Sequence, residues 1–92
     1  MKRIDLDAER WRTQDDFYAA LLSALGAPTW HGHNLDALWD SVVTGDINQV
    51  SPPFSVRVVN VPDGELRGFL VSIGELFREA RAKGVDVRFV LP

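Results

Sequence analysis

The stretch from Phe54 to Val61 constrains the fold of this chain most strongly, because it is rich in valine and apolar at nearly consecutive positions. That composition is typical of a β-strand covered on both faces. A turn at Pro62, Asp63 and Gly64 follows, then a helical pattern, and then a second strand from Val85 to Leu91. A strand, a helix and a strand joined by short connections predict a parallel pair with a right-handed crossover.

The segment between these two strands predicts a long amphipathic helix. Its apolar residues recur at helical spacing and form one stripe, at Leu66, Phe69, Leu70, Ile73, Leu76, Phe77 and Ala80. Gly68 and Gly74 each weaken a helix by roughly 1 kcal/mol relative to alanine, so the pattern leaves open either one helix or two. Gly84, which follows Arg81 and Lys83, is expected to end the helix.

The N-terminal part of the chain predicts a further strand and a helix. Lys2 to Leu6 alternates charged and apolar residues, as a short strand does. Thr13 is expected to cap a helix, with Asp16 three residues later in a near-capping box. Gly26 and Pro28 are expected to end that helix. Its buried stripe comprises Phe17, Ala20, Leu21, Leu22, Ala24 and Leu25.

The segment HGHNLDALWD, residues 31–40, predicts another helix after a short loop. Asn34 is a favourable N-cap, and Gly32 allows the chain to turn sharply just before it. The apolar residues after the cap recur at helical spacing, at Leu35, Leu38, Trp39 and Val42. The helix is expected to end near Gly45, and the stretch from Asp46 to Pro53 predicts a loop.

Asp36 and Asp40 lie four residues apart on a second face of this helix, next to the Trp39 edge of the apolar stripe. An indole and two carboxylates should therefore share one exposed ridge. Asp36 gains roughly 0.3–1 kcal/mol from the helix dipole. Asp40 lies beyond the reach of the dipole, and two like charges at this spacing cost roughly 0.2–0.5 kcal/mol. The spacing alone fits a solvated polar face as well as a binding site.

The distribution of charge favours a binding site for a basic partner. Residues 13–56 contain five aspartates and no lysine or arginine, a formal charge of −5, whereas the remaining 48 residues carry a formal +2. Such a field concentrates cationic partners and speeds their encounter. Direct binding of nucleic acid is disfavoured, because phosphates are bound by clustered lysine and arginine. A basic protein surface is the expected complement.

The size and composition of the chain exclude several classes of protein. With 92 residues, 46% of them hydrophobic, the chain is large enough for one core, which predicts a single domain spanning residues 1–92. The absence of cysteine excludes disulfides, thiolate metal sites and a cysteine nucleophile. No apolar segment follows the basic N-terminus and no window approaches 18 apolar residues, so we expect no membrane contact and a cytoplasmic location. The free protein is expected to be a monomer.

His31 and His33 leave a second class of function open. Their spacing, with Asp36 nearby, would suit zinc and hence a metal-dependent hydrolase. A catalytic zinc site needs three fixed ligands with supporting hydrogen bonds, and two histidines in a loop are usually polar loop residues. No Ser–His–Asp spacing, phosphate-binding loop or glycine fingerprint is present. We therefore predict no catalytic residue, no metal and no cofactor.

The sequence resembles the barstar family, the intracellular inhibitors of secreted bacterial ribonucleases. HGHNLDALWD, the valine-rich strand and LFREARAKGVDVRFVL at residues 76–91 carry the resemblance, which follows the element order through essentially the whole chain. The resemblance implies an α/β fold in which three to four helices pack on a small three-stranded parallel sheet. It also implies an inhibitory face, built from the second helix and the loop before it, that occludes the active site of the nuclease.

The resemblance further implies a role for individual residues of that face. Asp40 matches the aspartate that stands in for an RNA phosphate against the basic groups of the nuclease, Asp36 matches a neighbouring acidic contact, and Glu79 matches an outlying one. Neutral contacts are implied at Gly32, Asn34, Leu35 and Trp39. An ion pair with Lys83 on the same helix is the alternative role for Glu79.

Two positions and one loop depart from the family pattern. Trp30 lies where the family commonly has tyrosine, which keeps an aromatic contact but removes the hydroxyl. His33 lies where related sequences have acidic residues, so negative charge is lost, the more so below about pH 6.5, where histidine protonates. The loop from Gly45 to Pro53 also differs. The sequence thus predicts a ribonuclease inhibitor that binds a basic bacterial ribonuclease, and it leaves open an immunity protein against another toxin nuclease.

Overall fold

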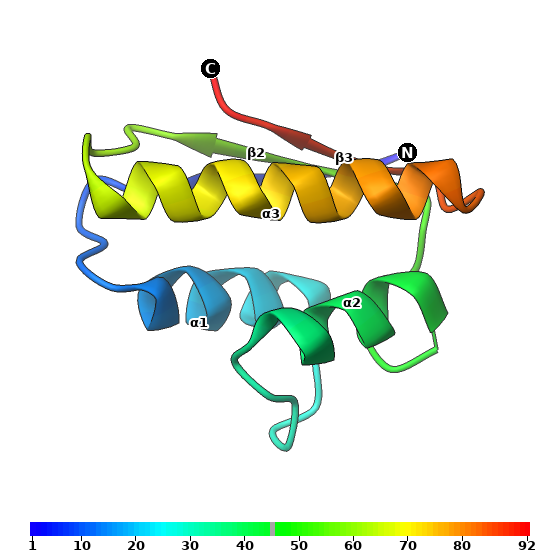
Figure 1. Ribbon diagram of the computed structural model, residues 1–92. Helices are drawn as coiled ribbons and strands as arrows, with labels where there is room; N and C mark the ends of the chain where they lie inside the picture. The colour runs from blue at the N-terminus through cyan, green and yellow to red at the C-terminus, as the bar shows by residue number, and fades with distance from the viewer. Residues whose placement is uncertain (45) are drawn as a thin grey trace.

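A three-stranded parallel sheet and three helices make up the described part of the chain, residues 1–44 and 46–92 of the computed structural model (Figure 1). In chain order the elements are β1 (Lys2–Asp7), α1 (Gln14–Leu25), α2 (Leu35–Thr44), β2 (Phe54–Val59), α3 (Glu65–Ala82) and β3 (Val87–Val90). This arrangement confirms the predicted α/β fold. Residues 46–53 form the predicted loop. The expected end of the second helix at Gly45 lies outside the described residues.

The strands lie in the order β1-β2-β3, and both pairs are parallel. Ile4 of β1 lies opposite Val56 of β2, which lies opposite Phe89 of β3. Right-handed crossovers that step in the same direction across a sheet place their helices on one face. Figure 1 shows α1, α2 and α3 together on one side of the sheet, as this rule requires.

The other face of the sheet is open, which corrects the prediction that the valine-rich strand is covered on both faces. In β2, Phe54, Val56 and Val58 are buried, whereas Arg57 is exposed and Ser55 and Val59 are only half-buried. The run of valines indicated two covered faces, but burial alternates because the helices lie on one side only. The open face carries exposed charged side chains, at Arg3, Asp5, Arg57 and Arg88.

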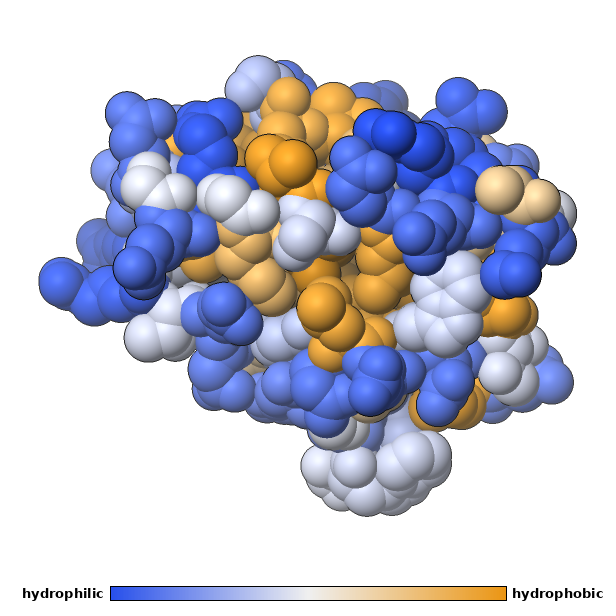
Figure 2. Space-filling model, viewed as in Figure 1, coloured by the Kyte–Doolittle hydropathy of each residue, from blue (hydrophilic) through white to orange (hydrophobic). Residues whose placement is uncertain are grey.

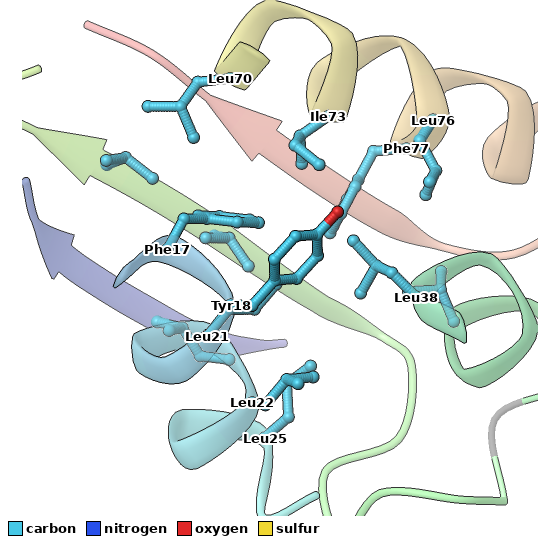
Figure 3. Close-up of a cluster of buried hydrophobic side chains, with 14 of the residues drawn as sticks. Phe17, Tyr18, Leu21, Leu22, Leu25, Leu38, Leu70, Ile73, Leu76 and Phe77 are labelled. Carbon is cyan, nitrogen blue, oxygen red and sulfur yellow. The ribbon is translucent and has the colours of Figure 1, made fainter. Parts of the chain in front are cut away.

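α3 is one unbroken helix, so the split that its glycines left open does not occur. Gly68 has no atom within 4 Å of the position that a Cβ would take, and Gly74 has only the Phe89 ring, at 3.7 Å. Neither glycine is needed to admit a neighbouring group, so both simply lower helix propensity. The helix holds because its whole predicted stripe is buried in the core. Figure 3 shows four residues of this stripe, Leu70, Ile73, Leu76 and Phe77.

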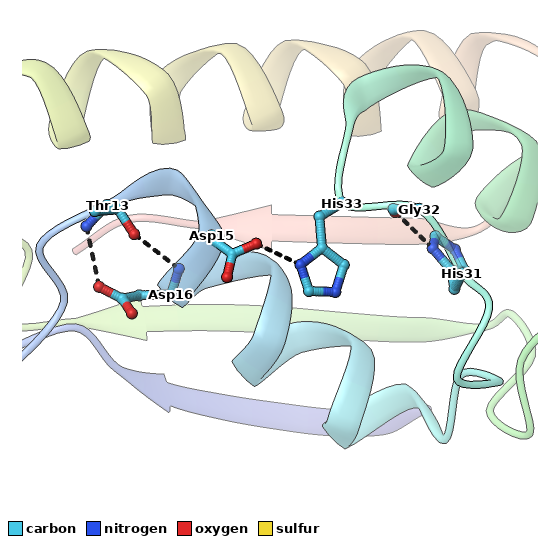
Figure 4. A network of polar contacts seen from close by, with 6 residues as sticks. All are labelled: Thr13, Asp15, Asp16, His31, Gly32 and His33. Carbon is cyan, nitrogen blue, oxygen red and sulfur yellow. Dashed lines mark hydrogen bonds and ion pairs between the residues drawn. The ribbon is translucent and has the colours of Figure 1, made fainter.

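α1 begins at a full capping box, as the spacing of Thr13 and Asp16 predicted (Figure 4). The Thr13 hydroxyl accepts a hydrogen bond from the Asp16 N–H at 3.3 Å. The Asp16 carboxylate accepts from the Arg12 N–H at 2.7 Å and from the Thr13 N–H at 3.0 Å. These two backbone donors favour the ionised carboxylate and lower the pKa of Asp16. Gly26, at φ 66°, ends the helix in the left-handed conformation.

Candidate functional site

α2 begins at the cap that the sequence predicted. The Asn34 side-chain oxygen accepts a hydrogen bond from the Ala37 N–H at 2.8 Å, which satisfies a free donor of the first turn. Gly32 is required for a different reason from the expected sharp turn. Its φ is not in the left-handed region, but a Cβ there would lie 2.9 Å from Asn34 Nδ2 and 3.2 Å from Ala37 Cβ. Gly32 therefore allows the loop to approach the cap closely.

Asp36 and Asp40 form an exposed acidic ridge along α2. Trp39 beside them is half-buried against the core, and Leu35 is 43% exposed. No cationic side chain among the described residues pairs with either carboxylate, and neither accepts a hydrogen bond there. The ridge thus combines apolar area with two charges that the fold leaves unneutralised.

A groove of about 260 Å³ lies between the first turn of α2 and α3. Its lining comprises Leu35, Asp36, Trp39, Ser72, Glu75, Leu76 and Glu79. This α2–α3 groove brings Glu79 beside α2, and within the described chain Glu79 does not form the alternative ion pair with Lys83. Asp40 lies one turn further along α2 and is not part of the lining.

Glu75 is a residue of the α2–α3 groove that sequence reasoning did not identify. It lies one turn before Glu79 on α3, and this four-residue spacing was the signal that could have found it. Arg78 donates to the Glu75 carboxylate at 3.1 Å. Of the acidic residues that line the groove, Asp36 and Glu79 are therefore those without a cationic partner in the described structure.

The loop between α1 and α2 projects away from the sheet (Figure 1). Trp30 in this loop is 74% exposed, the highest value among the exposed large apolar side chains of the described residues. Trp30 does not line the α2–α3 groove. An indole can bury a large area in a complex, so Trp30 is positioned to contact a partner that covers the loop and α2 together.

The family model described as Barstar (barnase inhibitor) matches residues 1–92, the whole chain. The chain belongs to the barstar family. Members of this family inhibit bacterial ribonucleases such as barnase and are not enzymes. None of the helices in the described ranges is long and apolar enough to cross a membrane.

In the described structure of this barstar-family chain, His31 and His33 make separate contacts (Figure 4). His31 is buried, and its Nδ1 donates to the Gly32 carbonyl at 2.8 Å, while its Nε2 has no partner among the described residues. His33 is exposed, and its Nδ1 donates to the Asp15 carboxylate at 2.5 Å. Across residues 1–44 and 46–92, no three His, Cys, Asp or Glu side chains are grouped so that they could hold a metal.

Two residues of α1 hold His33, and neither was singled out from the sequence as part of the site. Asp15 pairs with the imidazole, and the Tyr18 ring stacks on it with centroids 5.9 Å apart and an interplanar angle of 26°. These residues are 18 and 15 positions away from His33, so no local pattern relates them to it. The position at which negative charge was expected to be lost in this barstar-family chain therefore lies in contact with an aspartate from α1.

Proposed function

We propose that this protein inhibits a barnase-type ribonuclease by occluding its active site with α2, the loop before α2 and the α2–α3 groove. Carboxylates on α2 would take the place of RNA phosphates against the basic groups of the nuclease. The observation that carries the proposal is that Asp36, Asp40 and Glu79 have no cationic partner in the described structure. Figure 2 shows apolar surface between α3 and the other two helices, bordered by hydrophilic side chains.

The energetics of such a surface favour a cationic partner. Exposed carboxylates are hydrated in the free protein, and they gain strong, charge-assisted hydrogen bonds when a partner covers them and supplies cations. The apolar area beside the carboxylates, Leu35 and Trp39, supplies the buried contact that excludes water. The −5 formal charge of residues 13–56 should also steer a basic nuclease toward this side of the molecule. We expect the protein to act as a cytoplasmic monomer without a cofactor.

Titration of the purified protein into barnase, with RNA hydrolysis as the readout, tests the proposal. We expect complete inhibition at one equivalent, no effect of a metal chelator, and an association rate that falls as salt is added. Asp5→Asn, on the open face of the sheet, is the matched control and should inhibit like the unmodified protein. Full ribonuclease activity at a large excess of the protein would contradict the proposal for barnase.

An immunity protein against a different toxin nuclease is the second candidate. The exposed Trp30 and the paired His33 favour it, because both lie on the side of α2 where a partner would dock and both depart from the family pattern. Inhibition of another toxin nuclease in the same assay, with barnase unaffected, would select this candidate. Asp40→Ala should weaken inhibition in either case.

A further inference from the structure

The open face of the sheet, on the side away from the helices, gathers arginines that are far apart in the sequence (Figure 1). Arg3 of β1 and Arg88 of β3 flank Ser55 of β2 in one row across the sheet. Because neighbouring strands lie about 4.8 Å apart, the Cα atoms of these two arginines are about 10 Å apart. Arg57 lies on the same face, two residues further along β2. The strand pairing thus creates an arginine cluster, Arg3, Arg57 and Arg88, that no local sequence pattern records.

The fold leaves most of the charge of this arginine cluster unpaired. Arg3 and Arg57 form no ion pair with any described residue, although Asp5 lies opposite Arg57 in the sheet. Arg88 makes only a loose contact, with its Nε 3.9 Å from the Asp86 carboxylate and both side chains more than half exposed. Exposed ion pairs of this kind contribute little to stability. Folding therefore does not account for the cluster.

The acidic surface of α2 and α3 does not cancel the field of the arginine cluster. Asp36, Asp40 and Glu79 belong to helices on the other side of the sheet, and the molecule extends 22 Å even along its shortest principal axis. Charges in water are screened over about 8 Å at physiological ionic strength. The expectation that nucleic acid is disfavoured came from residues 13–56, which contain no cation, and the three arginines lie outside that range. An anion at the open face is therefore attracted.

We propose that the open face of the sheet binds the ribose–phosphate backbone of single-stranded RNA. Guanidinium groups bind phosphates through paired N–H donors, and three of them on a flat sheet allow one strand to cross β1, β2 and β3.

The carboxylates of the open face favour RNA over DNA. Asp5 would repel a ligand that offers phosphate alone, but it can accept a hydrogen bond from a ribose 2′-hydroxyl, which DNA lacks. Asp7, further along β1, already accepts from the Glu9 N–H and from Asn60. None of the described side chains on this face is aromatic, so bases have no ring to stack on and binding should not depend on base sequence.

Titration with a short fluorescein-labelled oligouridylate, followed by fluorescence anisotropy, tests the open face. We expect binding at about 50 mM salt, with the logarithm of the association constant falling against that of the salt concentration at a slope of about −2 for three phosphate contacts. Arg3→Gln and Arg57→Gln should each weaken binding severalfold and make the slope shallower by about 0.7. Lys83→Gln removes the same charge at an exposed position after α3 and is the matched control, which should bind like the unmodified protein.

A deoxyribose probe tests the contact with the 2′-hydroxyl. The oligouridylate should bind about two- to tenfold more tightly than the oligodeoxyuridylate of the same length. Asp5→Ala should abolish that preference and strengthen binding of the deoxyribose strand, because a negative charge is removed from the face.

Four outcomes would overturn the proposal: no binding at about 50 mM salt, unchanged affinity in both arginine variants, equal affinity for the oligodeoxyuridylate, or equal affinity for an oligoglutamate of the same charge. The last result would make an acidic protein segment the ligand. ¹H–¹⁵N NMR spectra show that each variant is folded, and the RNA should shift the amides of Ser55 and Arg57. The proposal does not rest on the inhibition of barnase, because the open face is separate from α2 and the α2–α3 groove.

Discussion

The first turn of α1 contains Asp15 and Asp16, that of α2 contains Asp36, and the fold uses Asp16 and Asp36 differently. Asp16 in α1 accepts hydrogen bonds from two backbone N–H groups, and they lower its pKa. Asp36 in α2 accepts none from the described residues, because the N3 position, from which a side chain reaches back to the N-cap backbone, is occupied in α2 by Ala37. An aspartate at N3 of α1 is thus used to cap its helix, whereas an aspartate at N2 of α2 remains available to a partner. Asp40, one turn later, belongs with Asp36.

The largest expected effect comes from removing a carboxylate that has no partner in the described structure. Asp40→Ala should weaken inhibition by about 2–5 kcal/mol, a magnitude adopted from the barnase–barstar complex, to whose inhibitor this chain is related. The loss arises because cations of the nuclease are left buried and unpaired. Asp36→Ala and Glu79→Ala should weaken inhibition less. The free energy of unfolding should stay unchanged or rise slightly in Asp40→Ala, since a like-charge neighbour of Asp36 is removed.

Inhibition titrations and urea unfolding of the three variants measure both quantities. If Asp40→Ala unfolds readily, yet inhibits normally when folded, then Asp40 is a structural residue, as Asp16 is. Equal losses of inhibition in all three variants would mean that no carboxylate of the ridge is central.

The next largest effect is expected from removing the cap of α1. Thr13→Ala removes the hydroxyl that caps α1 and should lower the free energy of unfolding by about 1 kcal/mol. Inhibition by the folded variant should not change, because Thr13 does not line the α2–α3 groove. Ser23→Ala, at an exposed position of the same helix, is the control and should leave stability nearly unchanged. A loss of inhibition matching that of Asp40→Ala would show that the α1 cap contacts the partner.

A smaller effect is expected from a substitution that stabilises the protein. Gly68→Ala should raise the free energy of unfolding by about 0.5–1 kcal/mol, since the site is helical and open space surrounds the new methyl group. Gly64→Ala is the matched control: it also has open space, but its φ of 108° strains any other residue, so it should destabilise. Thermal unfolding of both variants gives the two signs. Destabilisation by Gly68→Ala would mean that the helix does not run unbroken through this position.

The smallest effect is a dependence of stability on acid. The pKa of Asp16 is lowered in the folded protein, so its contribution to stability is present above the usual value of 3.8 and is lost as the pH falls through the folded-state pKa. The free energy of unfolding should therefore fall below about pH 4. Asp16→Asn should make that fall shallower, as measured by urea unfolding at a series of pH values. An unchanged slope in Asp16→Asn would assign the acid dependence elsewhere.

The elements of the fold were predictable because their signals are local. The Thr13–Asp16 spacing and the Asn34 cap each lie within a few residues of the helix start that they define, and both form as predicted. The apolar stripe of α3 repeats over the length of the helix, and burial of that stripe outweighs the low helix propensity of its two glycines. The grouping of Glu79 with α2 followed from the family resemblance and not from a local pattern.

The rest depends on packing that no local pattern records. The open face of the sheet follows from the strand order, which residues 54–59 alone cannot reveal. Gly32 is needed because the loop approaches the Asn34 cap, a contact set by the fold of the loop in three dimensions. The pairing of His33 with Asp15 joins two elements across 18 positions. The sequence alone therefore left open a metal-binding role for His33, whereas the structure pairs it with its neighbour on α1.

The pairing of β1 directly with β2 has a consequence for the order of folding. Residues 8–53, which include the ridge on α2 and the loop before it, form the connection between these two strands. Closing a connection of that length costs chain entropy before any contact between the strands compensates for it, so β1 stays unpaired until β2 is available. On the ribosome, a nascent chain that ends before residue 54 has no central strand on which α1 and α2 can pack. The acidic surface therefore appears late in synthesis, together with the sheet.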